Sequence, residues 1–218
     1  MTYQHLTLTK SGHIAWLTFN RPGKANALHY DHLLEIETAV LSLRDDPQTR
    51  VVVFTGAGKH FSSGAAMGRG ACISSACDFR IGSDNCFMQY PEVDIGLNLM
   101  WKSLPLIIHL AGPARAKRLV IGGERIEAPE LLNWGILDKQ VPLANLYDAA
   151  EKMAQHYADK PPIAAQMIKR STNQICNVLN GALMHMDADQ NLLAASTDDR
   201  TVAVQAYLKK EKPTFKGS

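Results

Sequence analysis

The sequence lacks the marks of a nucleic-acid-binding or membrane protein. The formal net charge of its 218 residues is only +2, and no block of like charge forms a patch for a polyanion, so we expect no nucleic-acid partner. No stretch approaches the roughly 18 apolar residues that span a membrane. Residues 1–10 also lack the apolar segment of a signal peptide, so we expect a cytoplasmic protein without membrane contact.

Three common site motifs are missing as well. The four cysteines, at positions 72, 77, 86 and 176, show no CxxC spacing, so we expect no metal site and interpret them as small buried apolar residues. The sequence contains no GxxxxGK[ST] segment, so nucleoside-triphosphate chemistry is not indicated. Ser62 and Ser63 lie outside any GxSxG motif, and no histidine has a spacing that marks it as a partner, which disfavours a serine nucleophile.

The apolar periodicity predicts an α/β fold. Residues 3–9 and 13–19 alternate around a Ser-Gly turn, which predicts a β-hairpin. A helical pattern over residues 28–46 then leads to RVVVFTG, a short strand that we expect to be buried. This strand–helix–strand order predicts a parallel crossover, and ligands in such sheets bind at the carboxyl ends of the strands.

The composition allows one large core with an appendage, because 46% of the residues are hydrophobic. After a last predicted strand in LDKQVP, amphipathic helices follow one another, including one over residues 181–196. We therefore expect a core over residues 1–142 and a helical region over 143–218 that packs on the core or on a neighbour.

Residues 59–92 hold the glycines and small side chains best suited to chemistry. GRGACISSACD predicts a glycine turn entering a helix, whose first N–H groups have no intrahelical acceptor and favour a developing negative charge. Arg69, between two glycines, offers either a side chain for an anion or its backbone N–H alone. Cys72, near the helix start, is either a thiol of lowered pKa or, as we favour, core packing.

Two acids follow in a predicted loop. Glu92 comes directly after Pro91, where partial burial would raise its pKa and make it a general acid or base. A solvated loop carboxylate is the more common case for such a residue. Asp94 is a weaker candidate than Glu92.

Six segments together resemble the enoyl-CoA hydratase/isomerase (crotonase) family, in the same order and over nearly the whole chain. They are RPGKANAL, VVVFTGAGKHFSSGA, MGRGACISSACDFRIGSDNCF, YPEVDIGL, GPARAKRL and GERIEAPELLNWGILDKQVP. The resemblance implies a crotonase-like ββα spiral core with a C-terminal helical trimerisation region. It also implies an acyl-CoA thioester substrate, with no metal or redox cofactor, and a homotrimer or hexamer.

The same resemblance assigns site residues. The thioester oxygen is expected between the backbone N–H groups of Ser63 and Arg69, and such donors stabilise an enolate by several kcal/mol. Glu92 is the expected acid/base. The residues implied in binding CoA and the acyl group are Lys24, Ala25, Ala27, Ser63, Ala65, Gly68, Arg69, Leu99 and Trp101.

The chain departs from the family pattern at three places. A few dozen residues, including a helix and a strand, are missing near residues 64–67; they are either deleted or left out of the numbering, and we favour the latter because six residues hardly replace a core strand. Cys72 stands where hydratases have a second glutamate. NLMWKS replaces a glycine-rich run and would narrow or reshape the acyl pocket through Leu99, Met100 and Trp101.

Three hypotheses follow from these residues. The first is an acyl-CoA enzyme in which a single glutamate moves protons, as in isomerases or other one-base members of the family. The second is a catalytically silent acyl-CoA-binding or assembly protein. The third is an acyl-CoA thioester hydrolase, in which Glu92 activates water.

Overall fold

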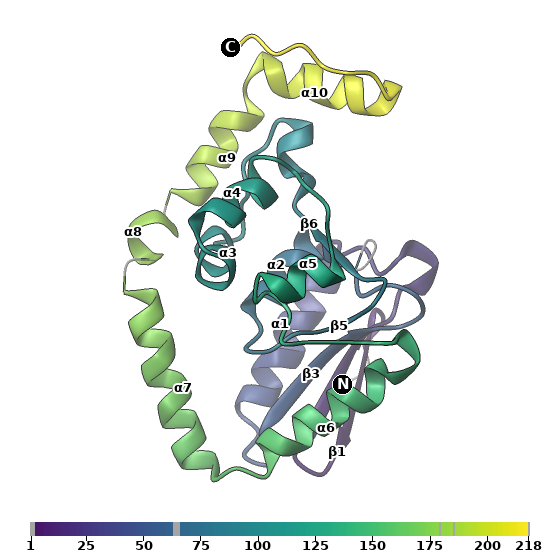
Figure 1. Ribbon diagram of the computed structural model, residues 1–218, viewed down its shortest axis with the longest axis vertical. Coiled ribbons are helices and arrows are strands. Elements are labelled where there is room, and N and C mark those ends of the chain that lie inside the picture. Colours follow the sequence, from purple (N-terminus) through teal and green to yellow (C-terminus); the bar gives the residue numbers. More distant parts are fainter. Residues whose placement is uncertain (1–2, 63–65, 179, 185, 218) are drawn as a thin grey trace.

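The computed structural model describes residues 3–62, 66–178, 180–184 and 186–217 (Figure 1). Its N-terminal sheet has the order β1-β2-β3. Strand β1 (Leu6–Ser11) runs antiparallel to β2 (Ile14–Phe19), and β2 runs parallel to β3 (Val51–Gly56). The hairpin and the parallel crossover through α1 (Tyr30–Arg44) are therefore confirmed.

Strand β2 is the centre of this sheet because both of its faces are covered. Its alternate residues Ala15, Leu17 and Phe19 pack with side chains of α1. The opposite face, with Ile14 and Trp16, packs against α6 (Leu146–Ala158). Helix α6 thus lies on the N-terminal sheet, although it belongs to the helical tail in sequence.

The prediction that RVVVFTG is a buried strand was wrong. Every residue of β3 is half-buried. In the described part of the chain β3 pairs only with β2, so it forms an edge of the sheet. An apolar sequence therefore did not place this strand in the middle of a sheet.

The middle of the chain builds a second core from short elements. Strands β4 (Ala66–Met67), β6 (Phe87–Gln89) and β7 (Ile126–Glu127) form one small sheet, and β5 (Ile81–Ser83) pairs with β8 (Lys139–Val141). Helices α2 (Arg69–Ala76), α3 (Leu104–Ala111), α4 (Pro113–Val120) and α5 (Ala128–Asn133) surround it. Tyr90, Ile107, Leu119, Ile126 and Ile136 are fully buried there.

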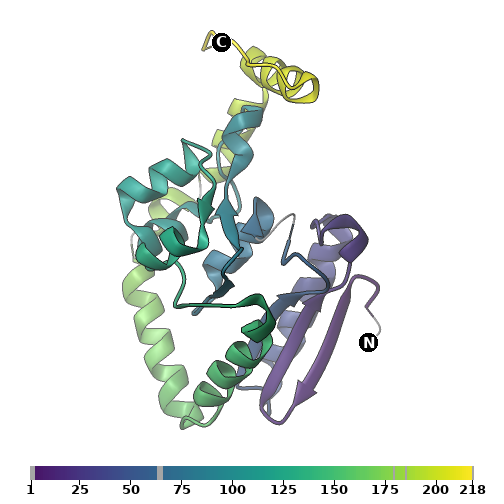
Figure 2. The same ribbon diagram turned by 45° about the vertical axis from the view of Figure 1, so that its right-hand side comes forward.

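The C-terminal helices form an arm along one side of the molecule. Helix α7 (Pro162–Asn177) follows one edge, and α8 (Asn180–Met184), α9 (Asp187–Ala195) and α10 (Asp198–Lys209) lead to the far end (Figures 1 and 2). The single helix expected over residues 181–196 is thus two helices. None of the described helices combines the length and the apolar character that crossing a bilayer requires.

The cysteine expectation holds only in part. Cys72 is buried, Cys77 and Cys86 are half-buried, and Cys176 on α7 is exposed. Cys176 lies on a helix that has no buried residue. The expectation that each cysteine is a buried apolar residue therefore fails at this position.

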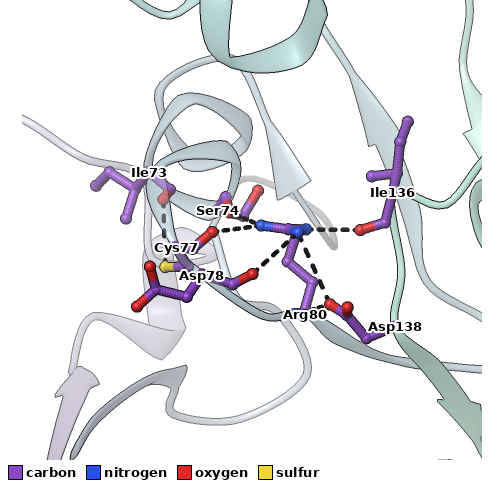
Figure 3. Close-up of polar contacts among 7 residues, drawn as sticks. All are labelled: Ile73, Ser74, Cys77, Asp78, Arg80, Ile136 and Asp138. Carbon is purple, nitrogen blue, oxygen red and sulfur yellow. Dashed lines mark hydrogen bonds and ion pairs between the residues drawn. The ribbon is translucent and has the colours of Figure 1, made fainter. Parts of the chain in front are cut away.

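A buried arginine joins α2 to the β5–β8 pair. The Arg80 guanidinium donates from Nε to Ile136 O at 2.6 Å and from Nη1 to Cys77 O at 2.5 Å (Figure 3). Its backbone N–H donates to Asp138 Oδ2 at 2.7 Å, and the Asp138 carboxylate lies 3.7 Å from Nη2. The charge is therefore buried with partners on three sides.

We expect Arg80→Met to lower the free energy of unfolding by about 3 kcal/mol, because it leaves buried carbonyl acceptors without a donor and removes the ion pair with Asp138. Urea unfolding measures this change. Arg125→Met is the matched control, because Arg125 is exposed; its guanidinium pairs with Glu127 and lies over the Phe87 ring. Equal unfolding midpoints for the two variants would contradict a stabilising role for Arg80.

A buried histidine predicts acid sensitivity. His32 has no exposed surface, and neither ring nitrogen has a hydrogen-bond partner among the described residues. Its ring lies 5.9 Å from that of His5 and 6.0 Å from that of His29, measured between centroids. Burial, the two histidines and Arg21 lower the pKa of His32 to about 4, against a smaller opposite effect of Glu35.

The pKa of His32 is lower in the folded state than its ordinary value of 6.5. The full stability of the fold is therefore present above about pH 6.5, where His32 is neutral in both the folded and the unfolded state. As the pH falls from about 6.5 to about 4, we expect up to about 3 kcal/mol of stability to be lost. His32→Phe should flatten this loss in urea titrations at several pH values. The exposed His156→Phe should keep it, and an equally steep loss in His32→Phe would refute the assignment.

Candidate active site

Glu92 lies in a short 3-10 turn, η2 (Pro91–Ile95). For a carboxylate in a predicted loop, a solvated position was the more common expectation. Glu92 Oε1 is so close to Gly68 that a Cβ on that glycine would lie 3.1 Å away. Its Oε2 is buried and has no hydrogen-bond partner among the described residues. Burial raises the pKa of Glu92 above 4.5, and the nearby Arg69 charge lowers it by less. The carboxyl group is thus a base of increased strength.

The N-terminus of α2 faces this carboxyl group. Gly68 precedes the helix with a φ of +52°, a conformation that favours glycine, and Arg69 is the first helical residue. As such, the Arg69 N–H has no intrahelical acceptor. A Cβ on Gly70 would lie 2.5 Å from Ser62 Cβ, so this glycine lets the helix approach the segment that follows β3. Both glycines of GRG are therefore required by geometry.

The segment expected to cradle CoA is tied to the same place. Its turn, η1 (Pro22–Lys24), leads into Asn26, whose side chain is fully buried. Asn26 Nδ2 donates to His60 O at 2.6 Å and to Ala57 O at 2.9 Å. Ser62 Oγ donates to Asn26 O at 3.1 Å. These bonds hold the 24–27 segment against the end of β3.

Within that segment, Lys24 is exposed, and Ala25 and Ala27 are half-buried. Asn26 was not among the expected site residues, although the sequence offers a signal, since Asn adopts the left-handed conformation more readily than most residues and has a φ of +55° here. Ser63 and Ala65, two of the expected site residues, lie outside the described residues.

The segment NLMWKS, residues 98–103, contacts Arg69 through Trp101. Arg69 Nη1 donates to Leu28 O at 2.8 Å, and its guanidinium lies 5.1 Å from the centroid of the Trp101 ring. Leu99 is buried, whereas Trp101 is 41% exposed. The structure therefore places Trp101 against the Arg69 side chain, at the end of α2 where Gly68 adjoins Glu92.

Cys72 is a buried neutral thiol. Its Sγ donates to Ser103 Oγ at 3.2 Å, and Ser103 Oγ donates to Met100 O at 2.9 Å. Burial raises the pKa of Cys72 to about 12, and the charge of Glu92 adds to the shift. The interpretation of Cys72 as a thiol of lowered pKa is therefore wrong, and the favoured one, core packing, agrees with its position.

No group of three or more His, Cys, Asp or Glu side chains in the described ranges is arranged to hold a metal ion. Asp94, the weaker of the two acids, is exposed. Its carboxylate faces Gly123, where a Cβ would lie 3.2 Å from either oxygen.

Known proteins match the chain over nearly its whole length. The profile of the Enoyl-CoA hydratase/isomerase family matches residues 9–68 and 63–218. A crotonyl-CoA hydratase of Syntrophomonas wolfei is 28% identical, with 99% of each chain covered. A carnitinyl-CoA dehydratase of Escherichia coli O157:H7 is 27% identical, covering 98% of this chain and 99% of that protein.

The solved structures agree on the fold. The crystal structure of an enoyl-CoA hydratase/isomerase from Pseudoalteromonas atlantica superposes with a TM-score of 0.92 at 20% identity, covering 98% of this chain and all of the other. The core thus has the crotonase fold.

The relatives contain a segment that has no counterpart in this chain. The alignment with the Syntrophomonas wolfei protein spans 257 positions, whereas this chain has 218 residues, so that protein contains a few dozen residues without a counterpart here. The two matched parts of the family profile meet at residues 63–68, where the sequence departs from the family pattern. Because the family profile matches residues 9–68 and 63–218, the chain belongs to the enoyl-CoA hydratase/isomerase family.

Proposed function

We propose that this protein moves a proton between carbon atoms of an acyl-CoA thioester, with Glu92 as the single acid/base. The observation that carries the proposal is the Glu92 carboxyl group: its Oε2 is buried without a partner among the described residues, and its Oε1 lies beside Gly68 at the N-terminus of α2. A buried acceptor without a partner costs free energy unless a ligand or a proton satisfies it. The printed names of the relatives, a crotonyl-CoA hydratase and a carnitinyl-CoA dehydratase, support a CoA thioester as that ligand.

The proposed reaction needs only proton transfer and charge stabilisation. With a 3-enoyl-CoA, the Glu92 carboxylate takes a proton from C2, and the C–H electrons form a dienolate whose charge rests on the thioester oxygen. The backbone N–H groups of Ser63 and Arg69 are the proposed donors to that oxygen. Glu92 then returns the proton to C4, which gives the 2-enoyl-CoA. We therefore propose no metal or redox cofactor.

Cys72 favours this one-base reaction over water addition. A thiol with a pKa of about 12 stays protonated at neutral pH and cannot position water as a carboxylate does. Its hydrogen bond to Ser103 also occupies the thiol. Water addition would then depend on Glu92 alone.

The remaining expected residues are proposed to bind the substrate. Lys24, Ala25 and Ala27 lie on the segment that Asn26 ties to β3, and we assign this segment to CoA. Ala65 and Gly68 would border the thioester. Leu99 and Trp101 would shape the pocket for the acyl chain, because they belong to the loop that follows Glu92.

The test is to incubate the protein with a 3-enoyl-CoA and to identify the products by mass spectrometry and NMR. A 2-enoyl-CoA with an intact thioester is the expected product. Binding without any product would favour the silent binding protein, and release of free CoA thiol would favour the hydrolase.

We also propose that the chain forms a homotrimer or a dimer of trimers. Helix α7 exposes Ile163, Met167, Ile168 and Ile175, each at least 63%, and α9 exposes Leu192 and Leu193. Two further leucines also motivated this expectation. Leu179 and the side chain of Leu183 lie outside the part of the chain that the structure describes. Light scattering at micromolar concentration should give at least three times the chain mass of 24.0 kDa. A monomer would contradict the proposal.

A further inference from the structure

The loop that follows Glu92 is held by the C-terminal arm. Arg200 Nη1 on α10 donates to Ile95 O, at the end of η2, over 2.6 Å. Asp187 Oδ2, in the first turn of α9, accepts from the backbone N–H of Lys102 at 2.7 Å. Asn98 Nδ2 reaches Gln190 on α9 at 3.4 Å. Three points of the loop over residues 95–102 are thus bonded to helices more than 80 residues away in sequence.

Backbone contact between α10 and η2 is unusually close. Gly96 has a φ of +69°, and a Cβ there would lie 2.9 Å from the Cα of Arg200. Figure 2 shows α10 beside the turn that carries Glu92. Gly96 is therefore required both by its conformation and by the helix that packs on it.

The same turn fixes the backbone of Glu92. The N–H of Leu97 donates to Glu92 O at 3.0 Å, and the N–H of Gly96 donates to Val93 O at 2.9 Å. Arg200 bonds the carbonyl of Ile95, which lies within the turn that these two hydrogen bonds close. A shift of α10 would therefore move the peptide groups that orient Glu92.

The far end of the loop is strained. Trp101 and Lys102 have φ values of +78° and +53°, a region that side-chain-bearing residues rarely adopt. Such strain persists only where the surroundings hold it. Asp187 holds Lys102, and the guanidinium of Arg69 lies over the Trp101 ring.

From these contacts we propose that α9 and α10 clamp the catalytic turn, with Arg200 as a positioning residue for Glu92 and Asp187 as a positioning residue for the loop end that carries Trp101. The inference rests on the proposed role of Glu92, which neither residue touches. Arg200 fixes the turn, and Asp187 fixes the strained end of the loop. The C-terminal arm would then be part of the catalytic apparatus as well as an association surface.

The first test compares Arg200→Met with Lys209→Met, since both remove one positive charge from α10 and Lys209 is exposed. In Arg200→Met we expect kcat for the 3-enoyl-CoA to fall about 10- to 100-fold with little change in KM, because misplacement by about 1 Å has this effect. The acid limb of the pH profile should move to lower pH, because a looser turn exposes Glu92 to water. Arg200→Lys should restore part of kcat.

A second measurement does not depend on activity. Amide hydrogen exchange at Gly96 and Leu97 should be faster in Arg200→Met than in Lys209→Met, with equal melting temperatures. If the parent protein does not turn over acyl-CoA, the proposed function fails, whereas this exchange still decides whether the clamp exists. Equal exchange rates in the two variants would overturn the clamp, as would a loss of kcat that merely follows a lower melting temperature.

Asp187 is tested in the same way. Asp187→Ala removes the acceptor for Lys102 N–H, whereas Asp187→Asn keeps an oxygen in place. We expect faster exchange of the Lys102 amide and an altered preference for acyl-chain length in the alanine variant, and near-parent behaviour in the asparagine variant. Asp189→Ala removes a charge from the same helix turn and is the control. An unchanged preference in Asp187→Ala would contradict the positioning role.

Discussion

Glu92→Gln is expected to lower the rate of double-bond migration by about 10²–10⁴, while acyl-CoA binding is largely kept. The amide has nearly the shape of the carboxyl group, so the turn over residues 91–95 should remain in place. It can neither accept the C2 proton as a base nor return it to C4 as an acid. Loss of turnover without loss of affinity is therefore the signature of the proposed role.

The pH dependence adds a second expectation for the parent protein. Burial raises the pKa of Glu92, and the base must be ionised to take a proton. The value of kcat/KM should therefore fall as the pH is lowered through a pKa above the ordinary 4.5. Glu92→Gln should lack this limb.

Turnover and affinity are measured on one preparation, by product formation and by calorimetric titration with acyl-CoA. Asp94→Asn is the matched control, because Asp94 is an exposed acid in the same turn. It should behave as the parent does. Parent-like turnover in Glu92→Gln would show that another residue is the base.

Cys72→Glu is expected to raise water addition to a 2-enoyl-CoA, without a matching gain in double-bond migration. The resemblance to hydratases places a glutamate at this position, and a second carboxylate would orient the attacking water. Migration needs only Glu92 and gains nothing from it.

The structure adds a cost to this substitution. Cys72 is buried, bonded to Ser103 and within electrostatic reach of Glu92, so a new carboxylate there meets both burial and a like charge. We expect the fold to lose several kcal/mol unless the new group stays protonated. Cys72→Ala controls for the lost thiol. Unchanged hydration in a Cys72→Glu protein that melts as the parent does would contradict the one-glutamate account.

Local patterns predicted the elements that local physics determines. The alternation around Ser11-Gly12 gave the hairpin, and apolar spacing gave α1, because side-chain periods of 2 and 3.6 are set within one element. Only the resemblance assigned Gly68 and Glu92 to one site, since these residues come from different elements. The burial of β3 was mispredicted because an apolar run does not specify how many strands flank it.

Contacts between distant segments could not be predicted from the sequence. Asn26 bonds to residues 31 and 34 positions away, and Arg200 bonds across 105 positions to Ile95. No motif or periodic pattern links Asn26 to its partners, and none links Arg200 to Ile95. Such bonds depend on how whole elements pack, which composition and spacing do not specify.

The central claim is that Glu92 acts without a second carboxylate, and the partition of products tests it most directly. One preparation of the parent protein is given a 3-enoyl-CoA and, separately, a 2-enoyl-CoA, and the rates of double-bond migration and of water addition are compared. We predict faster migration than hydration. Faster hydration that is unaffected by Cys72→Ala would contradict the claim, because another group would then supply the second acid.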